Sequence, residues 1–98
     1  MENRLRILIV DDFETVRLFL RNALNQIGIE NINEAGDGRE ALQMIQEYKK
    51  SGEPFEMIFC DWNMPEMTGL ELLQELRKTA EFKTLPFVMV TAESESSR

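Results

Sequence analysis

The chain has 98 residues, a formal net charge of −7, one cysteine and no histidine. This length fits one small domain with a single core, and no apolar run approaches the roughly 20 residues that a membrane-spanning helix needs. The acidic balance argues against nonspecific binding to nucleic acid, which uses a clustered basic surface. The lack of histidine excludes histidine-based catalytic triads and the usual zinc sites.

Two features predict a cytoplasmic protein that is not attached to a membrane. Residues 1–4 lead straight into a strand-like run without a small-residue cleavage site, so we expect no signal peptide. Cys60 has no partner for an internal disulfide, and it lies in an apolar run where a thiol behaves as a small hydrophobe. A reducing compartment suits such a cysteine.

The first half of the chain alternates between strand-like and helix-like patterns. Apart from Arg6, residues 5–10 are apolar and rich in β-branched side chains, as in a strand covered on both faces. Residues 13–27 repeat apolar side chains with helical spacing, and Gly28 suits a helix C-terminus. Residues 31–35 form a weak strand near a sheet edge, and Asp37 can cap the next helix. The apolar positions of the two helices are Val16, Phe19, Leu20, Ala23, Leu24 and Ile27, then Ala41, Leu42, Ile45 and Tyr48.

The second half continues the alternation. An apolar run over residues 57–60 stops at Asp61, and a turn containing Asn63 and Pro65 follows. A helix striped by Leu70, Leu73 and Leu76 precedes an apolar strand at residues 87–90. The order β-α-β-α-β-α-β predicts an α/β fold, in which right-handed crossovers place helices on both faces of a parallel sheet.

Oxygen-bearing side chains follow three of the four predicted strands. Asp11 and Asp12 follow the first, Asp61 the third and Thr91 the fourth. Neighbouring strand ends lie about 5 Å apart, and carboxylates that close repel unless a proton or a cation joins them. Hard oxygen ligands select magnesium, calcium or manganese, and magnesium usually shares its shell with a phosphate. These residues predict a magnesium-assisted phosphate site.

Simpler interpretations stay open for each residue alone. Asp11 or Asp12 could cap the helix that starts near Phe13. The segment from Asp61 to Pro65 could be turn chemistry only, and Thr91 could be a plain strand residue. Trp62 and the methionines fit packing better than ligand contacts. The combination of acids after two different strands is what favours a site.

Four motifs resemble the receiver domain of two-component response regulators, most nearly its single-domain chemotaxis members. They are residues 9–12 (IVDD), 34–42 (EAGDGREAL), 61–69 (DWNMPEMTG) and 90–92 (VTA), and together they span essentially the whole chain. The resemblance implies a flavodoxin-like, doubly wound parallel sheet with strand order 2-1-3-4. It treats residues 1–98 as one receiver domain without its fifth strand and last two helices.

The resemblance also implies roles. Asp61 would be the phosphoacceptor for the phosphohistidine of a sensor histidine kinase. Asp12, Asp61 and the backbone carbonyl of Asn63 would bind Mg²⁺ directly, and Asp11 would act through a bound water. Thr91 would hydrogen-bond the phosphoryl oxygens. Such a protein assists its own phosphorylation and dephosphorylation without being a separate turnover enzyme, and a flagellar switch protein would be a partner of the complete regulator.

The chain departs from the family after its fourth strand, where receivers continue to a strand that ends in Lys-Pro. All lysines here precede that strand, so none matches the active-site lysine of the family; they are Lys49, Lys50, Lys78 and Lys83. We expect metal binding with weak or uncoupled phosphorylation. Residues 87–90 would form an exposed edge that favours self-association by edge pairing or exchange of elements. A fragment of a longer regulator is the alternative.

Two rival functions come from other classes. Phosphatases of the haloacid dehalogenase type use a D-x-D motif after the first strand, whereas Asp61-x-Asn63 follows the third and lacks the second acid. A degenerate receiver would keep the fold, bind partners and accept no phosphate.

Overall fold

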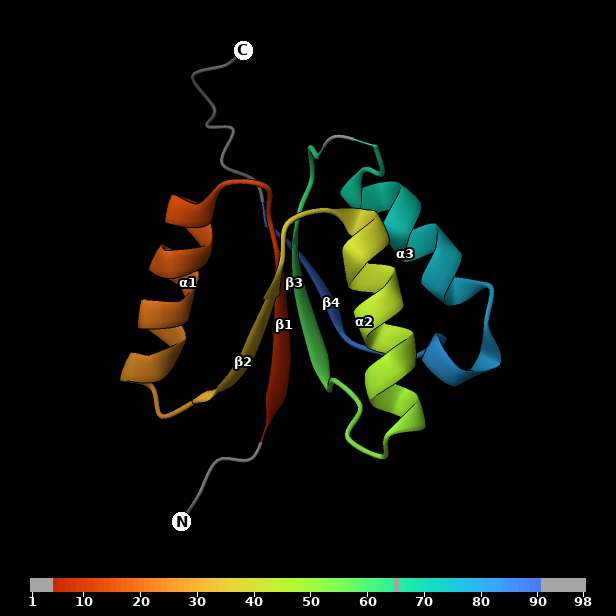
Figure 1. Ribbon diagram of the computed structural model, residues 1–98, viewed down its shortest axis with the longest axis horizontal. Helices are drawn as coiled ribbons and strands as arrows, with labels where there is room; N and C mark the ends of the chain where they lie inside the picture. Colours follow the sequence, from red (N-terminus) through yellow and green to blue (C-terminus); the bar gives the residue numbers. More distant parts are fainter. Residues whose placement is uncertain (1–4, 65, 91–98) are drawn as a thin grey trace.

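The computed structural model describes residues 5–64 and 66–90, and it confirms the predicted alternation of strands and helices (Figure 1). The elements are β1 (Arg6–Val10), α1 (Glu14–Gln26), β2 (Asn31–Ala35), α2 (Gly38–Lys50), β3 (Met57–Asp61), α3 (Gly69–Arg77), the short 3₁₀ helix η1 (Ala80–Phe82) and β4 (Phe87–Val90). Within these ranges, no helix is both long and apolar enough to span a membrane.

The four strands form one parallel sheet in the order β2-β1-β3-β4. This is the order that a flavodoxin-like fold implies, so the predicted fold class is confirmed. In register, Ile7 of β1 lies opposite Ile32 of β2 and Met57 of β3, and Asp61 of β3 lies opposite Val90 of β4. The carboxyl ends of the strands therefore share one edge of the sheet, at the top of Figure 1.

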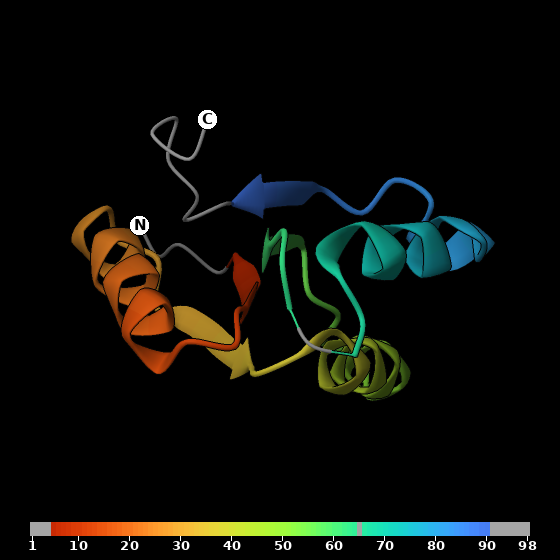
Figure 2. The ribbon, with the colours of Figure 1, turned by 90° about the horizontal axis from the view of Figure 1, so that it is seen from above.

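Helices cover both faces of the sheet, which explains why β1 shows no alternation in sequence. Helix α1 lies on one face, and α2 and α3 lie on the other (Figure 2). Leu8 and Val10 belong to the core under α2 and α3, whereas Ile7 and Ile9 belong to the core under α1. All four side chains are at most 1% exposed.

The apolar stripe of α1 is wider than the face that the sheet covers. Leu24 is buried and Leu20 packs partly against the same core, but Phe19 is 71% and Ile27 is 69% exposed. The reason is that α1 packs against β1 along one side only, so positions about 100° further round the helix point away from the sheet. Helical spacing located the helix but did not define its buried side.

The buried residues of α2 agree with the predicted face, whereas those of α3 correct it. Ala41 and Ile45 of α2 are at most 1% exposed. In α3, Leu72 and Leu76 are fully buried and Leu70 is 42% exposed. The contact therefore follows an i, i+4 pair, and the expected stripe through Leu70 was wrong at that position.

Local capping chemistry sets where the helices begin and end. The Asp37 carboxylate accepts a hydrogen bond from the Glu40 N–H at 2.8 Å, so the predicted cap of α2 is confirmed. Gly28 follows α1 with a φ of +92°, a backbone conformation that glycine adopts without strain. Thr68 and Glu71 form a capping box that starts α3 just beyond the third strand.

Candidate functional site

Three aspartates meet at the carboxyl edge of the sheet. Asp11 and Asp12 follow β1, and Asp61 is the last residue of the adjacent strand β3. Each residue offers a carboxylate oxygen, and these three oxygens lie within 4.8 Å of one another. The structure therefore brings together the three acids that the sequence analysis selected.

The two strand-end acids are buried, whereas the third is open to solvent. Asp11 is 2% and Asp61 is 7% exposed, and Asp12 is exposed. The Phe13 N–H donates to Asp11 Oδ1 at 2.8 Å. The backbone N–H of Asn63 donates to the Asp61 carboxylate. The site thus has two buried carboxylates and one carboxylate that faces solvent.

Burial and mutual repulsion make ionisation of the buried pair costly. Loss of hydration raises the pKa of Asp11 above its ordinary value, and the charge of Asp12 raises it further, against the Phe13 hydrogen bond and the Arg17 charge. Loss of hydration also raises the pKa of Asp61, followed by repulsion from Asp11. A divalent cation would reduce this penalty, because its two positive charges offset most of the negative charge of the three carboxylates.

The donor set fits a hard cation. All three side-chain ligands are carboxylate oxygens, which suit magnesium, calcium or manganese. The neighbouring thiol does not change this choice, because burial raises the pKa of Cys60 to about 12 and its Sγ contacts the Asp61 carbonyl oxygen at 3.3 Å. Cys60 stays a protonated core residue and is not a soft metal ligand.

The two remaining predicted site residues have different outcomes. Asn63 lies in the exposed loop two residues after Asp61, and its N–H binds the Asp61 carboxylate, while the metal role of its carbonyl stays a prediction. Thr91 lies outside the described residues. Its neighbour Val90 is paired in register with Asp61, and the Trp62 N–H donates to the Val90 carbonyl at 3.1 Å.

The helix-cap interpretation of Asp11 and Asp12 is not what the structure shows. The residue at the N-cap of α1 is Phe13, and no side-chain hydrogen bond caps this helix. Asp11 instead accepts from Phe13 two residues ahead, which closes a tight Asx-type turn between β1 and α1. This turn leaves the second Asp11 oxygen available to the acid cluster.

Two supporting features went unnoticed in the sequence. Gly69 lies against the Asp61 carbonyl, and its N–H donates to the Trp62 carbonyl at 3.0 Å. Gly69 is the first residue of α3, eight residues after Asp61, so its position in the sequence did not indicate this close approach. Arg17 donates to the Asp11 carbonyl at 2.6 Å and to Glu34 at 2.8 Å. No sequence pattern indicated that contact, because it joins residues on different elements.

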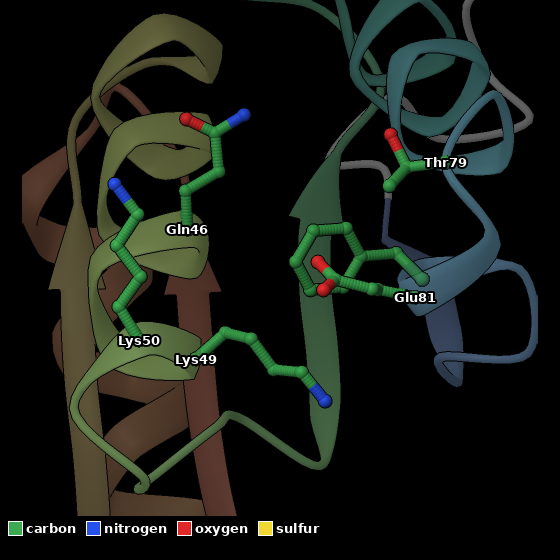
Figure 3. Close-up of a pocket in the computed structure, with 6 residues that line it drawn as sticks. Gln46, Lys49, Lys50, Thr79 and Glu81 are labelled. Carbon is green, nitrogen blue, oxygen red and sulfur yellow. The ribbon is translucent and has the colours of Figure 1, made fainter.

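A surface groove of about 410 Å³ lies at the opposite end of the sheet, between α2 and η1 (Figure 3). Its lining residues are Gln46, Lys49, Lys50, Thr79, Glu81 and Phe82. In Figure 3, Lys49 extends from α2 toward the side of the groove that carries Glu81. None of the three clustered aspartates lines this groove, so it is separate from the candidate site.

Comparison with known proteins agrees with this arrangement. Residues 7–98 match the family described as the response regulator receiver domain. The chemotaxis protein CheY of Pseudomonas aeruginosa is 47% identical over 90 residues, which are 92% of this chain and 68% of that protein. The structure of the chemotaxis response regulator CheY4 of Vibrio cholerae has a TM-score of 0.78 and 34% identity, covering 95% of this chain and 72% of that one.

A third relative was solved with ligands. The receiver domain of the histidine kinase CKI1 from Arabidopsis thaliana, complexed with Mg²⁺ and BeF3⁻, has a TM-score of 0.78 and 29% identity. The match covers 91% of this chain and 66% of that one. A parallel α/β sheet with an acid cluster at its carboxyl edge defines the class of protein. The chain belongs to the response regulator receiver family, and its fold is CheY-like.

Proposed function

We propose that this chain is a phosphoaccepting receiver in which Asp61 takes a phosphoryl group from the phosphohistidine of a sensor histidine kinase. The observation that carries the proposal is the placement of the Asp61 carboxylate at the end of β3, within 4.8 Å of carboxylate oxygens from Asp11 and Asp12. One side of this cluster is open through the exposed Asp12. We expect a phosphorylated imidazole to approach the cluster from the side of Asp12.

The transfer is a displacement at phosphorus. A carboxylate oxygen of Asp61 forms the new O–P bond while the P–N bond of the phosphohistidine breaks. The bonding electrons stay on the imidazole nitrogen, which gains a proton from solvent. Asn63 orients the carboxylate through its N–H group, and this matters because phosphoryl transfer depends mainly on positioning and charge neutralisation.

Magnesium is the proposed cofactor of this step. Asp12, Asp61 and the Asn63 carbonyl would hold it directly, and Asp11 would hold it through a water. When bound, the ion offsets the negative charge of the carboxylates and of the incoming phosphoryl oxygens. The raised pKa values of Asp11 and Asp61 support this assignment, because burial and then the neighbouring carboxylates disfavour their ionised forms, which a bound cation would stabilise. The magnesium-bound receiver of CKI1 supports it by similarity.

The proposed activity is a signalling step and not a separate turnover reaction. Three lysines have contacts away from the cluster: Lys49 and Lys50 line the opposite groove, and Lys78 pairs with Glu75 at 3.0 Å. We expect slow phosphorylation that is weakly coupled to any conformational change. Thr91, next to the paired residue Val90, is the proposed contact for the phosphoryl oxygens.

The cellular setting is also a proposal. The names of the matched relatives support a role in chemotaxis. We propose in addition that the chain acts in the cytoplasm and that a flagellar switch protein is the output partner of the complete regulator. We propose that residues 1–98 belong to one receiver domain. The matched region corresponds to 68% of the P. aeruginosa relative.

Self-association is a second proposal, and the position of β4 supports it. Among the described strands, β4 has a neighbour on one side only, and Val88 in its middle is 39% exposed. An unpaired, apolar parallel strand is a template for pairing with another chain. The partner would be a second copy, joined edge to edge or by exchange of elements.

Phosphorylation of the purified chain tests the main proposal. The chain is incubated with Mg²⁺ and acetyl phosphate and then examined by intact-mass spectrometry, with Asp61→Asn as the matched control. We expect a slowly gained single phosphoryl group that Asp61→Asn lacks and that EDTA prevents. Equal labelling of the control would refute the assignment. Magnesium binding without any label would favour a degenerate receiver, and steady release of phosphate from added monoesters would favour a phosphatase.

A further inference from the structure

The loop that carries two of the three acids is held from outside by Arg17. This residue is in the first turns of α1, and its guanidinium lies against the end of β1. Arg17 Nη1 donates to the Asp11 backbone carbonyl at 2.6 Å, and Arg17 Nε donates to Glu34 Oε1 at 2.8 Å. The side chains of Arg17 and Glu34 are 19% and 28% exposed, so water competes poorly for these bonds.

Glu34 is itself fixed by a second arginine. Arg21, one turn after Arg17, donates to Glu34 Oε2 at 2.7 Å and to the Ile32 carbonyl at 3.2 Å. Each carboxylate oxygen of Glu34 therefore has its own arginine partner. Planar guanidinium groups hold such contacts in a fixed geometry, so the position of Arg17 is determined by β2 as well as by its own helix.

The backbone of Asp11 has few other restraints. Its N–H donates to the Ala35 carbonyl at 3.1 Å, which continues the pairing with β2. Its carboxylate accepts from Phe13 within the same turn. The bond from Arg17 to the Asp11 carbonyl is thus the link that ties the peptide between Asp11 and Asp12 to α1 and β2.

We propose that Arg17, held by Glu34, is a positioning residue for the acid cluster. It fixes the peptide plane between Asp11 and Asp12, and so it sets the direction in which both carboxylates face Asp61. Arg17 acts through Asp11 and does not touch the metal or the phosphoryl group. This inference rests on the proposed function, because the geometry that it preserves is that of the Mg²⁺ site.

Magnesium titrations of matched variants test this role. The fluorescence of Trp62, the single tryptophan, reports binding from the loop after Asp61. The variants are Arg17→Met, which keeps an unbranched apolar side chain, Arg17→Lys, which keeps the charge without the planar guanidinium group, and Glu34→Gln. The control is Arg6→Met, which removes an ion pair with Glu53 (3.7 Å) at the other end of the sheet. Urea unfolding in EDTA measures the stability of each variant separately.

We expect Arg17→Met and Arg17→Lys to weaken Mg²⁺ binding roughly tenfold, which is the usual scale for loss of an outer-shell partner. Glu34→Gln should weaken it in the same direction. The Arg17→Met, Glu34→Gln double variant should bind Mg²⁺ no more weakly than Arg17→Met alone, because both changes break the same series of contacts from Glu34 through Arg17 to Asp11. Arg6→Met should keep the wild-type affinity.

Other outcomes would overturn the inference. Unchanged affinity in folded Arg17→Met, with only its unfolding midpoint lowered, would mean that the ion pair is merely structural. Full Mg²⁺ affinity in Arg17→Lys would mean that the positive charge alone suffices and that the guanidinium group does not position the acid cluster. A wild-type chain without any Mg²⁺ response would refute the proposed function and this inference together, whereas a normal wild-type response with insensitive variants refutes the inference alone.

Discussion

Gly69 lies so close to the backbone carbonyl of Asp61 that a side chain at this position would overlap it. A Cβ atom would also come within 2.9 Å of the Met89 sulfur and 3.2 Å of the Asp61 carbonyl carbon. The start of α3 is thereby packed directly against the residue that carries the proposed phosphoacceptor. Backbone atoms cannot move aside as a flexible side chain can.

We therefore expect Gly69→Ala to destabilise the fold by about 1–3 kcal/mol, the usual cost of overpacking a filled site, and to weaken Mg²⁺ binding because the Asp61 peptide must shift. Urea unfolding and a Trp62 fluorescence titration measure the two effects. Gly36→Ala is the control. The Cβ that this change adds would lie 3.7 and 3.9 Å from its nearest atoms outside the neighbouring residues, which is ordinary van der Waals contact. Equal effects of the two substitutions would contradict the packing argument.

The buried side of α3 predicts unequal effects of two leucines. Leu72 is fully buried, so Leu72→Ala should lower the free energy of unfolding by about 2–5 kcal/mol. Leu70 is 42% exposed, and Leu70→Ala should change it by less than about 1 kcal/mol. Urea unfolding with Mg²⁺ absent measures both. A larger loss for Leu70→Ala would show that the helix packs with a different face.

The acid cluster predicts a pH-dependent stability in EDTA. The pKa values of Asp11 and Asp61 are raised above 3.8, chiefly by burial, so the folded chain binds protons more readily than the unfolded chain. The free energy of unfolding should then fall as the pH rises from 3.8 through the raised values, and stay low above them. Asp61→Asn should flatten part of this slope and stabilise the metal-free fold at neutral pH.

Glu34 contributes to the pH dependence of the free energy of unfolding with the opposite sign. Its titration therefore sets the lowest pH at which the effect of the acid cluster can be measured separately. Burial raises its pKa, but hydrogen bonds from Arg17 and Arg21 outweigh this and hold the pKa below 4.5. Its stabilising contribution is present above 4.5 and is lost as the pH falls through the lowered value. Urea unfolding should therefore be compared above that range. If the free energy of unfolding depended on pH in the same way for the wild type and for Asp61→Asn, the prediction for the acid cluster would be contradicted.

The exposed strand β4 predicts self-association that a charge should prevent. Val88→Lys places a cation in the middle of this strand, which is a common way in which edge strands resist pairing. Light scattering should show a concentration-dependent mass above one chain for the wild type and a mass of one chain for Val88→Lys. Gln46→Lys, an exposed change on α2, should behave like the wild type. A wild-type mass of one chain at micromolar concentration would end this proposal.

Sequence pattern predicted the fold well because strand runs, turn residues and helical spacing are local signals. The acids at the ends of β1 and β3 were also predictable, since parallel topology brings those ends together. Pattern failed where the answer depends on contacts between elements. The exposed Phe19 and Leu70 lie on helices whose buried side is chosen by the sheet, and the bond from Arg17 to Asp11 joins parts of the chain that no periodicity relates.

Magnesium titration of Trp62 fluorescence tests the central claim most directly, because Trp62 follows Asp61 and is the single tryptophan. We expect a saturable change for the wild type, at least about a tenfold weaker response for Asp61→Asn, and no difference for Glu81→Gln, an exposed acid in the opposite groove. A wild type without response, or an Asp61→Asn variant that binds Mg²⁺ as tightly as the wild type, would contradict this claim.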